Sequence, residues 1–224
     1  LAGSRKAFAE LSKVAVGKGV TIITSLNLPS EDLPHADSNA HYNALFIFSR
    51  NGQVYSPQAK ITPQSFEKRH LDDSFPKMEV TPYSYLNRVT LNQNGESFDA
   101  FFFICSDLYV LPLFEPEQLE SEAIICPANF GNGAERAAEE VINYTIKSGL
   151  FKRGFYSNTC QTVKSGMTPL TIAVEKVLVP EKERIYKKAD MEEIVKKSSV
   201  VYPDEEYLNF KSMLKLTQNG TFTV

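Results

Sequence analysis

Alternation between apolar and polar positions divides the chain into short segments of helical and of strand character. Apolar residues at helical spacing predict an amphipathic helix over residues 4–16, ended by Gly17 and Gly19. Apolar and β-branched runs predict strands over 20–25, 44–49, 53–55, 89–91, 97–104, 123–126 and 154–162, and a strand, turn and strand over 168–179. Further helices are expected over 115–122, 134–148 and 191–197.

Turn residues separate these elements. Asn51-Gly52 and Asn94-Gly95 predict two tight hairpins. Residues 27–39 are expected to form a loop, 61–82 an irregular segment, and 200–224 a less regular tail with a turn at Gly220. Helices that alternate with short strands, with two hairpins inserted, predict one layered α/β or α+β domain with a mixed sheet.

Composition excludes several classes of protein. With 42% hydrophobic and 23% charged residues in 224, the chain is neither a disordered, a fibrous nor a disulfide-stapled protein. The net charge of −3 and the lack of a basic block argue against nucleic acid or an anionic membrane as partner. No apolar run approaches the roughly 20 residues that span a bilayer, and no signal segment is visible. Three cysteines without CxxC spacing favour a reducing compartment, so a cytoplasmic location is expected.

Few side chains stand out as chemistry. The three histidines lack ligand spacing, so no metal site is expected. Cys105 ends the most apolar strand, a place where α/β sheets carry reactive groups, although position alone favours a small buried hydrophobe. Cys126 and Cys160 lie in apolar strands and are assigned to the core. Lys60 and Glu67, taken singly, are surface charges.

The order of motifs resembles the nitrilase superfamily, the carbon–nitrogen hydrolases. The matching positions, in chain order, are Asn43, Gly52, Lys60, Glu67, Cys105-Ser106-Asp107, Pro127-Ala128 and Asn158. No single motif is specific, since Cys-x-Asp has only three residues. The resemblance runs from about residue 4 to about 198 and depends on the ordered set.

The resemblance implies a four-layer αββα sandwich with mixed sheets, present as one domain over residues 1–224. It further implies that a strand, a helix, a strand and the catalytic Glu of the family lie upstream of residue 1. The tail over 199–224 is expected to be an arm of a homodimer.

The resemblance also implies roles for individual residues. Cys105 would be the nucleophile, Lys60 would stabilise the oxyanion and Glu67 would orient Lys60. Oxyanion or substrate contacts would come from Ser106, Asn129 and Asn158. Asp107 is expected to fix its loop by accepting hydrogen bonds rather than to act as a second base.

The implied reaction is hydrolysis of a small amide, carbamoyl compound or nitrile through a cysteine thioester, with no cofactor. Two alternatives remain open at this point. One is a catalytically inactive relative that binds or regulates, and the other is an N-acyltransferase that uses the same cysteine.

Overall fold

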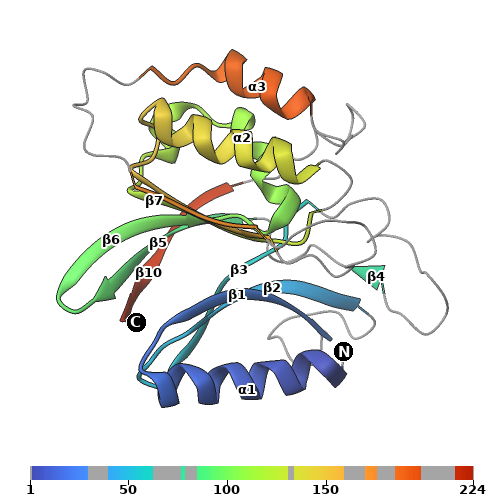
Figure 1. Ribbon diagram of the computed structural model, residues 1–224, viewed down its shortest axis with the longest axis vertical. Helices are drawn as coiled ribbons and strands as arrows, with labels where there is room; N and C mark the ends of the chain where they lie inside the picture. The colour runs from blue at the N-terminus through green and yellow to red at the C-terminus, as the bar shows by residue number, and fades with distance from the viewer. Residues whose placement is uncertain are drawn as a thin grey trace.

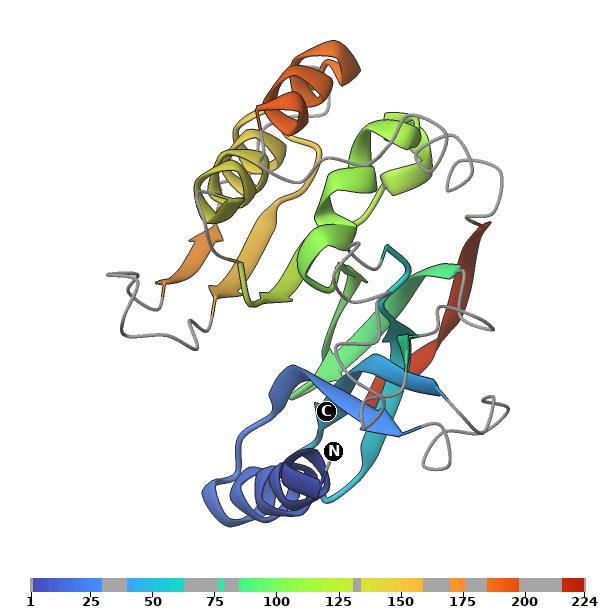
Figure 2. The ribbon, with the colours of Figure 1, turned by 90° about the vertical axis from the view of Figure 1, so that its right-hand side faces the viewer.

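The computed structural model arranges the chain as four layers, in the order helix, sheet, sheet and helix (Figures 1 and 2). It describes residues 2–29, 40–62, 77–78, 85–130, 134–158, 170–175, 185–197 and 215–223. Helix α1 (Ala2–Lys18) covers the outer face of the first sheet, whereas α2 (Ala134–Lys147) and α3 (Lys188–Lys196) lie over the second. This arrangement confirms the predicted αββα sandwich. No helix in the described ranges is long and apolar enough to cross a membrane.

Both sheets mix parallel and antiparallel pairs. The first contains β1 (Ile22–Pro29), β2 (Ala40–Phe48), β3 (Val54–Ala59) and β4 (Lys77–Met78). The second has the order β10 (Lys215–Thr223), β5 (Tyr85–Gln93), β6 (Glu96–Phe102), β7 (Ala123–Ala128), β8 (Arg153–Asn158) and β9 (Leu170–Glu175). Strands β6, β7 and β8 run parallel, so their carboxyl ends meet at one edge of the sheet.

The second sheet is buried on both faces along β6. Phe102 and Ile104 pack between the two sheets, with Leu45 of β2 opposite them. Phe101 and Phe103 point to the other face, into the core beneath the helices. A strand covered on both sides reads as a continuous apolar run, which explains why residues 100–104 carry no polar side chain.

Helix α1 is amphipathic and buries one stripe against the first sheet. The ring of Phe8 makes edge-on contacts with Phe46 and Phe48 of β2, with centroids 5.2 and 5.1 Å apart. Ala15 on the same stripe is fully buried, and its small side chain lets the helix approach the sheet. The predicted helix over 4–16 is confirmed and is slightly longer.

Both predicted hairpin turns are present. Asn94 and Gly95 have φ values of 55° and 83° between β5 and β6, which is the backbone a two-residue hairpin turn requires. Gly52 has a φ of 84° between β2 and β3. Asn and Gly are the residues that adopt this left-handed backbone at low cost.

The helix predicted over 115–122 is wrong for most of its length. Only a single 3-10 turn, η3 (Pro116–Leu119), forms there. The preceding residues instead form a longer 3-10 helix, η2 (Cys105–Leu113), which the sequence did not predict. Pro112 lies inside η2 and lacks the N–H that a regular helix would use at that position.

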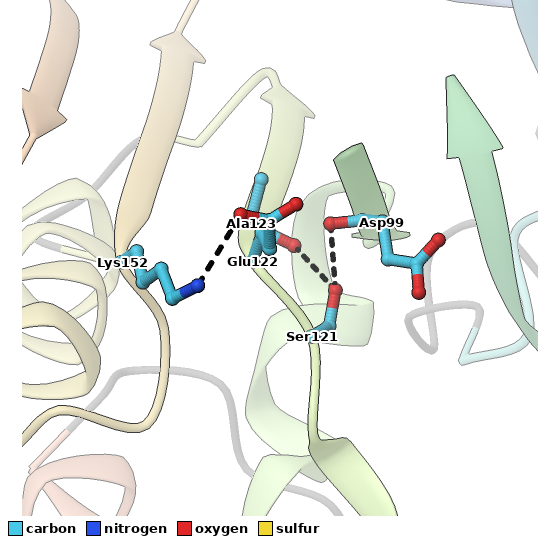
Figure 3. Close-up of polar contacts among 5 residues, drawn as sticks. All are labelled: Asp99, Ser121, Glu122, Ala123 and Lys152. Carbon is cyan, nitrogen blue, oxygen red and sulfur yellow. Dashed lines mark hydrogen bonds and ion pairs between the residues drawn. The ribbon is translucent and has the colours of Figure 1, made fainter. Parts of the chain in front are cut away.

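The residues after η3 are held by the neighbouring strands instead of by a helix. The hydroxyl of Ser121 donates to the carbonyl of Asp99 at 2.8 Å, and the N–H of Glu122 donates to the same carbonyl at 3.1 Å (Figure 3). Lys152 forms an ion pair with Glu122, with 3.3 Å between Nζ and Oε1. These contacts fix the chain at the start of β7 and so align β7 between β6 and β8.

The end of the chain also differs from the prediction. Residues 215–223, expected to be irregular, form β10, which pairs in parallel with β5 of the same chain. A register shift between Asn219 and Thr221 replaces the expected turn at Gly220. A role for the tail as a dimer arm stays a prediction. Within the segment predicted as two strands over 168–179, the described part is the single strand β9.

We expect Gly154→Ala to destabilise the protein by about 1–3 kcal/mol, because overpacking a tight interface strains it. Gly154 lies in β8 beneath α2, and an added Cβ would lie 3.0 Å from Cγ2 of Ile142 and 3.2 Å from Ile146. Urea unfolding measures the difference. Gly17→Ala in α1 is the matched control, since its Cβ would meet no atom within 4 Å, and it should be as stable as wild type or more so. Equal stability of the two variants would contradict the packing described here.

Candidate functional site

Cys105 lies where the central strand β6 leaves the sheet. Phe103 and Ile104 follow the strand, and Cys105 then begins η2 with a φ of 53°. Among the described residues other than glycine, only Asn94 shares a positive φ. A left-handed backbone at a residue with a Cβ costs on the order of 1–2 kcal/mol. This sharp turn places the partly exposed Cys105 at the carboxyl end of a central strand, as predicted.

Lys60 directly follows β3 and is buried, with 2% of its surface exposed. Its backbone N–H donates to the carbonyl of Asn43 in β2 at 2.8 Å. Two residues earlier, the side chain of Gln58 accepts the N–H of Asn87 in β5 at 3.0 Å. The end of β3 is therefore attached to both sheets. Lysine is seldom so deeply buried in a protein, so a buried Lys60 at the end of β3 is a candidate functional residue.

Asp107 joins the segment after Lys60 to the turn that carries Cys105. Its carboxylate accepts the N–H of Ile61 at 3.1 Å, and the N–H and hydroxyl of Thr62 at 2.8 and 2.6 Å. It also accepts the N–H of Ile104 at 3.3 Å. Asp107 is completely buried. The predicted loop-fixing role is therefore confirmed, and the carboxylate also reaches across to the other sheet.

Ser106 adds a second link between the same two segments. Its hydroxyl donates to the carbonyl of Thr62 at 2.9 Å, and Ser106 is fully buried. We refer to Thr62, Ser106 and Asp107 as the latch. Cys105 lies between Ile104, whose N–H donates to Asp107, and Ser106, whose hydroxyl donates to Thr62. The backbone of Cys105 is therefore restrained on each side.

Burial and neighbouring charges shift the pKa values of Asp107 and Cys126. Burial raises the pKa of Asp107 to about 6, and the positive charge of Lys60, together with hydrogen bonds from Thr62 and Ile61, opposes this rise. Burial also raises the pKa of the Cys126 thiol, to which Cys105 and Asp107 contribute, whereas Lys60 lowers it. Lys60, Cys105 and Asp107 therefore each influence Cys126, and Lys60 also influences Asp107. The hydrogen bonds of Ile61 and Thr62 to Asp107 join the segment that carries Lys60 to the turn that carries Cys105.

Asn158 ends β8, and its side chain holds the backbone that follows β7. The N–H of Phe130 donates to Oδ1 of Asn158 at 2.6 Å, and Nδ2 donates back to the carbonyl of Phe130 at 3.1 Å. The ring of Phe130 also packs on Tyr109 of η2, with centroids 5.5 Å apart. These contacts give Asn158 a structural role, and a direct contact with substrate stays a prediction.

Asn129 lies next to this clamp and is exposed at the carboxyl end of β7. Because β6 and β7 are parallel, Asn129 and Cys105 lie at the same edge of the sheet. Glu67 lies outside the described residues. Across the described ranges, no three His, Cys, Asp or Glu side chains gather as a metal ion would require.

Sequence reasoning missed the part of Thr62 in this site. Its only local signal is a hydroxyl residue two positions after Lys60, at the end of a strand. The partners of Thr62, Ser106 and Asp107, lie in η2, 44 and 45 residues further along the chain, so no short motif contains them together.

Comparison with solved structures identifies the fold. A CN-hydrolase superfamily protein from Xanthomonas campestris, with an arsenic adduct in its active site, matches with a TM-score of 0.52 and 14% identity. The match covers 88% of this chain and 76% of that protein. An amidase from Nesterenkonia sp. matches with a TM-score of 0.47 and 15% identity, over 77% of this chain and 59% of the amidase.

The first of these matches shows that the chain has the fold of a CN-hydrolase (nitrilase) superfamily protein. The resemblance predicted from the motifs is thus confirmed at the level of fold. The second match, with its lower TM-score, carries no argument, and the chain spans less than two thirds of that amidase. No family model matches the chain, and no curated protein matches it.

We expect Asn158→Asp to be about 1–3 kcal/mol less stable than wild type near neutral pH, because it leaves the Phe130 carbonyl without a donor and opposite a carboxylate oxygen. That repulsion raises the pKa of the introduced carboxyl in the folded protein above its unfolded value near 4. Its protonated form is favoured by folding, so the deficit relative to wild type shrinks as pH falls below the folded pKa.

Urea unfolding of variant and wild type at neutral and mildly acidic pH measures this deficit. Asn129→Asp is the matched control, because Asn129 is exposed and adjacent to the same segment. It should change stability little at either pH. A deficit in Asn158→Asp that does not depend on pH would contradict the clamp on Phe130.

Proposed function

We propose that the protein is a thiol-dependent hydrolase of a non-peptide carbon–nitrogen bond, in an amide, a carbamoyl compound or a nitrile. One observation carries this proposal: hydrogen bonds to Asp107 join the segment that follows the buried Lys60 to the left-handed turn of the partly exposed Cys105. The fold shared with a CN-hydrolase superfamily protein supports it.

For an amide, the reaction begins when Sγ of Cys105 bonds to the carbonyl carbon and the C=O electron pair moves to oxygen. The thiolate is the reactive form of cysteine, so the thiol proton must first pass to a base. When the C–N bond breaks, the nitrogen takes up a proton and leaves as ammonia or an amine. Water then attacks the thioester on Cys105, which releases the carboxylic acid and regenerates the thiol.

Lys60 is proposed to stabilise the negative oxygen of the tetrahedral intermediate. Lys60 extends from a strand end that is attached to both sheets, so its backbone needs no reorganisation when that charge develops. One such donor is worth about 2.7–4 kcal/mol. The backbone N–H of Ser106 and the side chain of Asn129 are proposed to contribute further donors at the same edge of the sheet. Glu67 is proposed to orient Lys60 and to keep it charged.

Asp107 is not proposed as the base, although its pKa of about 6 would suit one. Its two oxygens already accept hydrogen bonds from Ile61, Thr62 and Ile104. A carboxylate surrounded by donors has little capacity left for the thiol proton.

The direct test incubates the protein with a panel of small amides, ureido compounds and nitriles, followed by acid quench and intact mass spectrometry. We expect at least one compound to add the mass of its acyl group to Cys105 and to release ammonia or an amine. Release of ammonia or an amine without any adduct on Cys105 across the panel would contradict a thioester intermediate, and so would an adduct at another residue.

The panel also separates hydrolysis from its two alternatives. If a second amine added to the mixture receives the acyl group in place of water, the protein is an acyltransferase. If compounds bind without adduct or product, it is a binding relative.

We expect Cys105→Ser to lose at least about a thousandfold in turnover, because the hydroxyl is a far weaker nucleophile than a thiolate. Lys60→Met should lose about a hundredfold or more in kcat, the size of effect seen when an oxyanion donor is removed. Steady-state kinetics on a compound found by the panel measures both.

Cys126→Ala is the matched control, since Cys126 is a neighbouring buried cysteine whose thiol pKa is raised by burial. It should retain turnover within a few fold of wild type. Full activity in Cys105→Ser, or complete loss in Cys126→Ala with an intact fold, would refute the assignment of the nucleophile.

A further inference from the structure

The carboxylate of Asp107 accepts more hydrogen bonds than are needed to fix its own loop. Its donors come from both sides of the site: Ile61 and Thr62 follow Lys60, and Ile104 precedes Cys105. The nearest donor on each side is thus one residue from Lys60 or from Cys105. A shift of the carboxylate would therefore move the two reactive residues relative to each other.

The two segments belong to different sheets, and Asp107 bonds directly to the backbone next to both reactive residues. Lys60 follows β3 of the first sheet, whereas Cys105 follows β6 of the second. A reaction that needs an ammonium beside a developing oxyanion is sensitive to displacements of about 1 Å. The Gln58–Asn87 contact joins the two sheets two residues before Lys60, and the latch adds a restraint next to Lys60 and Cys105 themselves.

We propose that Asp107 is a positioning residue that holds the ammonium of Lys60 beside the thiol of Cys105 through the latch. This inference rests on the proposed function, since Lys60 and Cys105 are its reactive pair. Asp107 itself forms no bond to substrate and transfers no proton.

The direction in which the pKa of the Cys105 thiol changes when Asp107 is replaced distinguishes a positioning residue from a nearby negative charge. Removing the negative charge of Asp107 stabilises the thiolate of Cys105 and, acting alone, lowers the thiol pKa. Losing the restraint on Lys60 removes a positive charge from beside the thiolate and raises the thiol pKa. The proposal requires the second effect to exceed the first.

Besides Asp107 and Cys105, the ionisable groups of the described residues that interact electrostatically with this site include Lys60 after β3, Cys126 in β7 and Tyr156 in β8. Burial and the two cysteines raise the pKa of the Tyr156 phenol, so it stays neutral over the range measured. Burial keeps Cys126 protonated, so it does not compete for an alkylating reagent. Above the Asp107 pKa of about 6, the latch carboxylate is ionised in the wild type. Measurements from neutral to alkaline pH therefore report Cys105.

The experiment measures the rate of alkylation by iodoacetamide against pH, with the labelled residue located by tandem mass spectrometry. It needs no substrate. In Asp107→Asn we expect the apparent pKa of Cys105 to rise by about one unit, so that alkylation near neutral pH slows about tenfold. An apparent pKa that falls or stays the same in the folded variant overturns the proposal.

Thr62→Val supplies a second variant that leaves the charge of Asp107 in place. It removes the hydroxyl that donates to the carboxylate at 2.6 Å. We expect alkylation to slow about threefold in Thr62→Val and to return to the wild-type rate in Thr62→Ser, which keeps the hydroxyl. If Asp107→Asn does not fold, the alkylation rates of Thr62→Val and Thr62→Ser decide the proposal, and an unchanged rate in Thr62→Val overturns it.

Thr145→Val is the matched control for a purely structural effect. Thr145 is also fully buried, and its hydroxyl donates to the carbonyl of Ile142 within α2 at 2.7 Å. It should lower stability without changing the alkylation of Cys105. An equal slowing in Thr145→Val and Thr62→Val would show a general loss of packing and overturn the proposal.

The hydrolase function and the positioning role of Asp107 can be refuted independently of each other. If no compound acylates Cys105 but Asp107→Asn still raises its pKa, the latch positions Lys60 and the proposed hydrolase function is wrong. If acylation occurs and the alkylation profile is unchanged in both Asp107→Asn and Thr62→Val, the function holds and the positioning role is wrong.

Discussion

The carboxylate of Asp107 is the contact on which the arrangement of the site depends. A buried carboxylate is costly unless hydrogen bonds and an opposite charge compensate for lost water. Here it receives the N–H groups of Ile61, Thr62 and Ile104, the hydroxyl of Thr62 and the field of Lys60. Because these groups come from the ends of strands in different sheets, the same compensation that stabilises the charge also joins the sheets at the site.

The left-handed turn at Cys105 follows from this constraint. Residues 100–104 are buried on both faces of the second sheet, so the strand cannot slide to relax the turn. On the far side, Ser106 and Asp107 are bonded to the segment after β3. The backbone of Cys105 is therefore strained between two fixed ends, and the side chain remains partly exposed while both neighbours are buried. A side chain held in this way is already oriented, as the proposed role of Cys105 as a nucleophile requires.

The features that local sequence determines could be predicted. Asn94-Gly95 dictates a hairpin turn, and the apolar run ending at Ile104 dictates a central strand with Cys105 at its end. Features that depend on distant partners could not. Strand β10 pairs with β5 from far along the chain, and the residues after η3 are held by the carbonyl of Asp99 in β6 although their composition favours a helix. Thr62 gives no signal for the same reason, since its partner Asp107 lies 45 residues further along the chain, in η2.

The proposed mechanism requires the Lys60 ammonium to lie beside the Cys105 thiol and to stabilise negative charge there. The most direct test is an ultraviolet titration of the Cys105 thiolate in the protein and in Lys60→Met, both with Cys126 and Cys160 replaced by alanine. Because the Lys60 ammonium favours the thiolate, we expect the apparent pKa of the Cys105 thiol to be at least about one unit lower in the protein that retains Lys60. An identical pKa in the two proteins, with the fold intact, would contradict it.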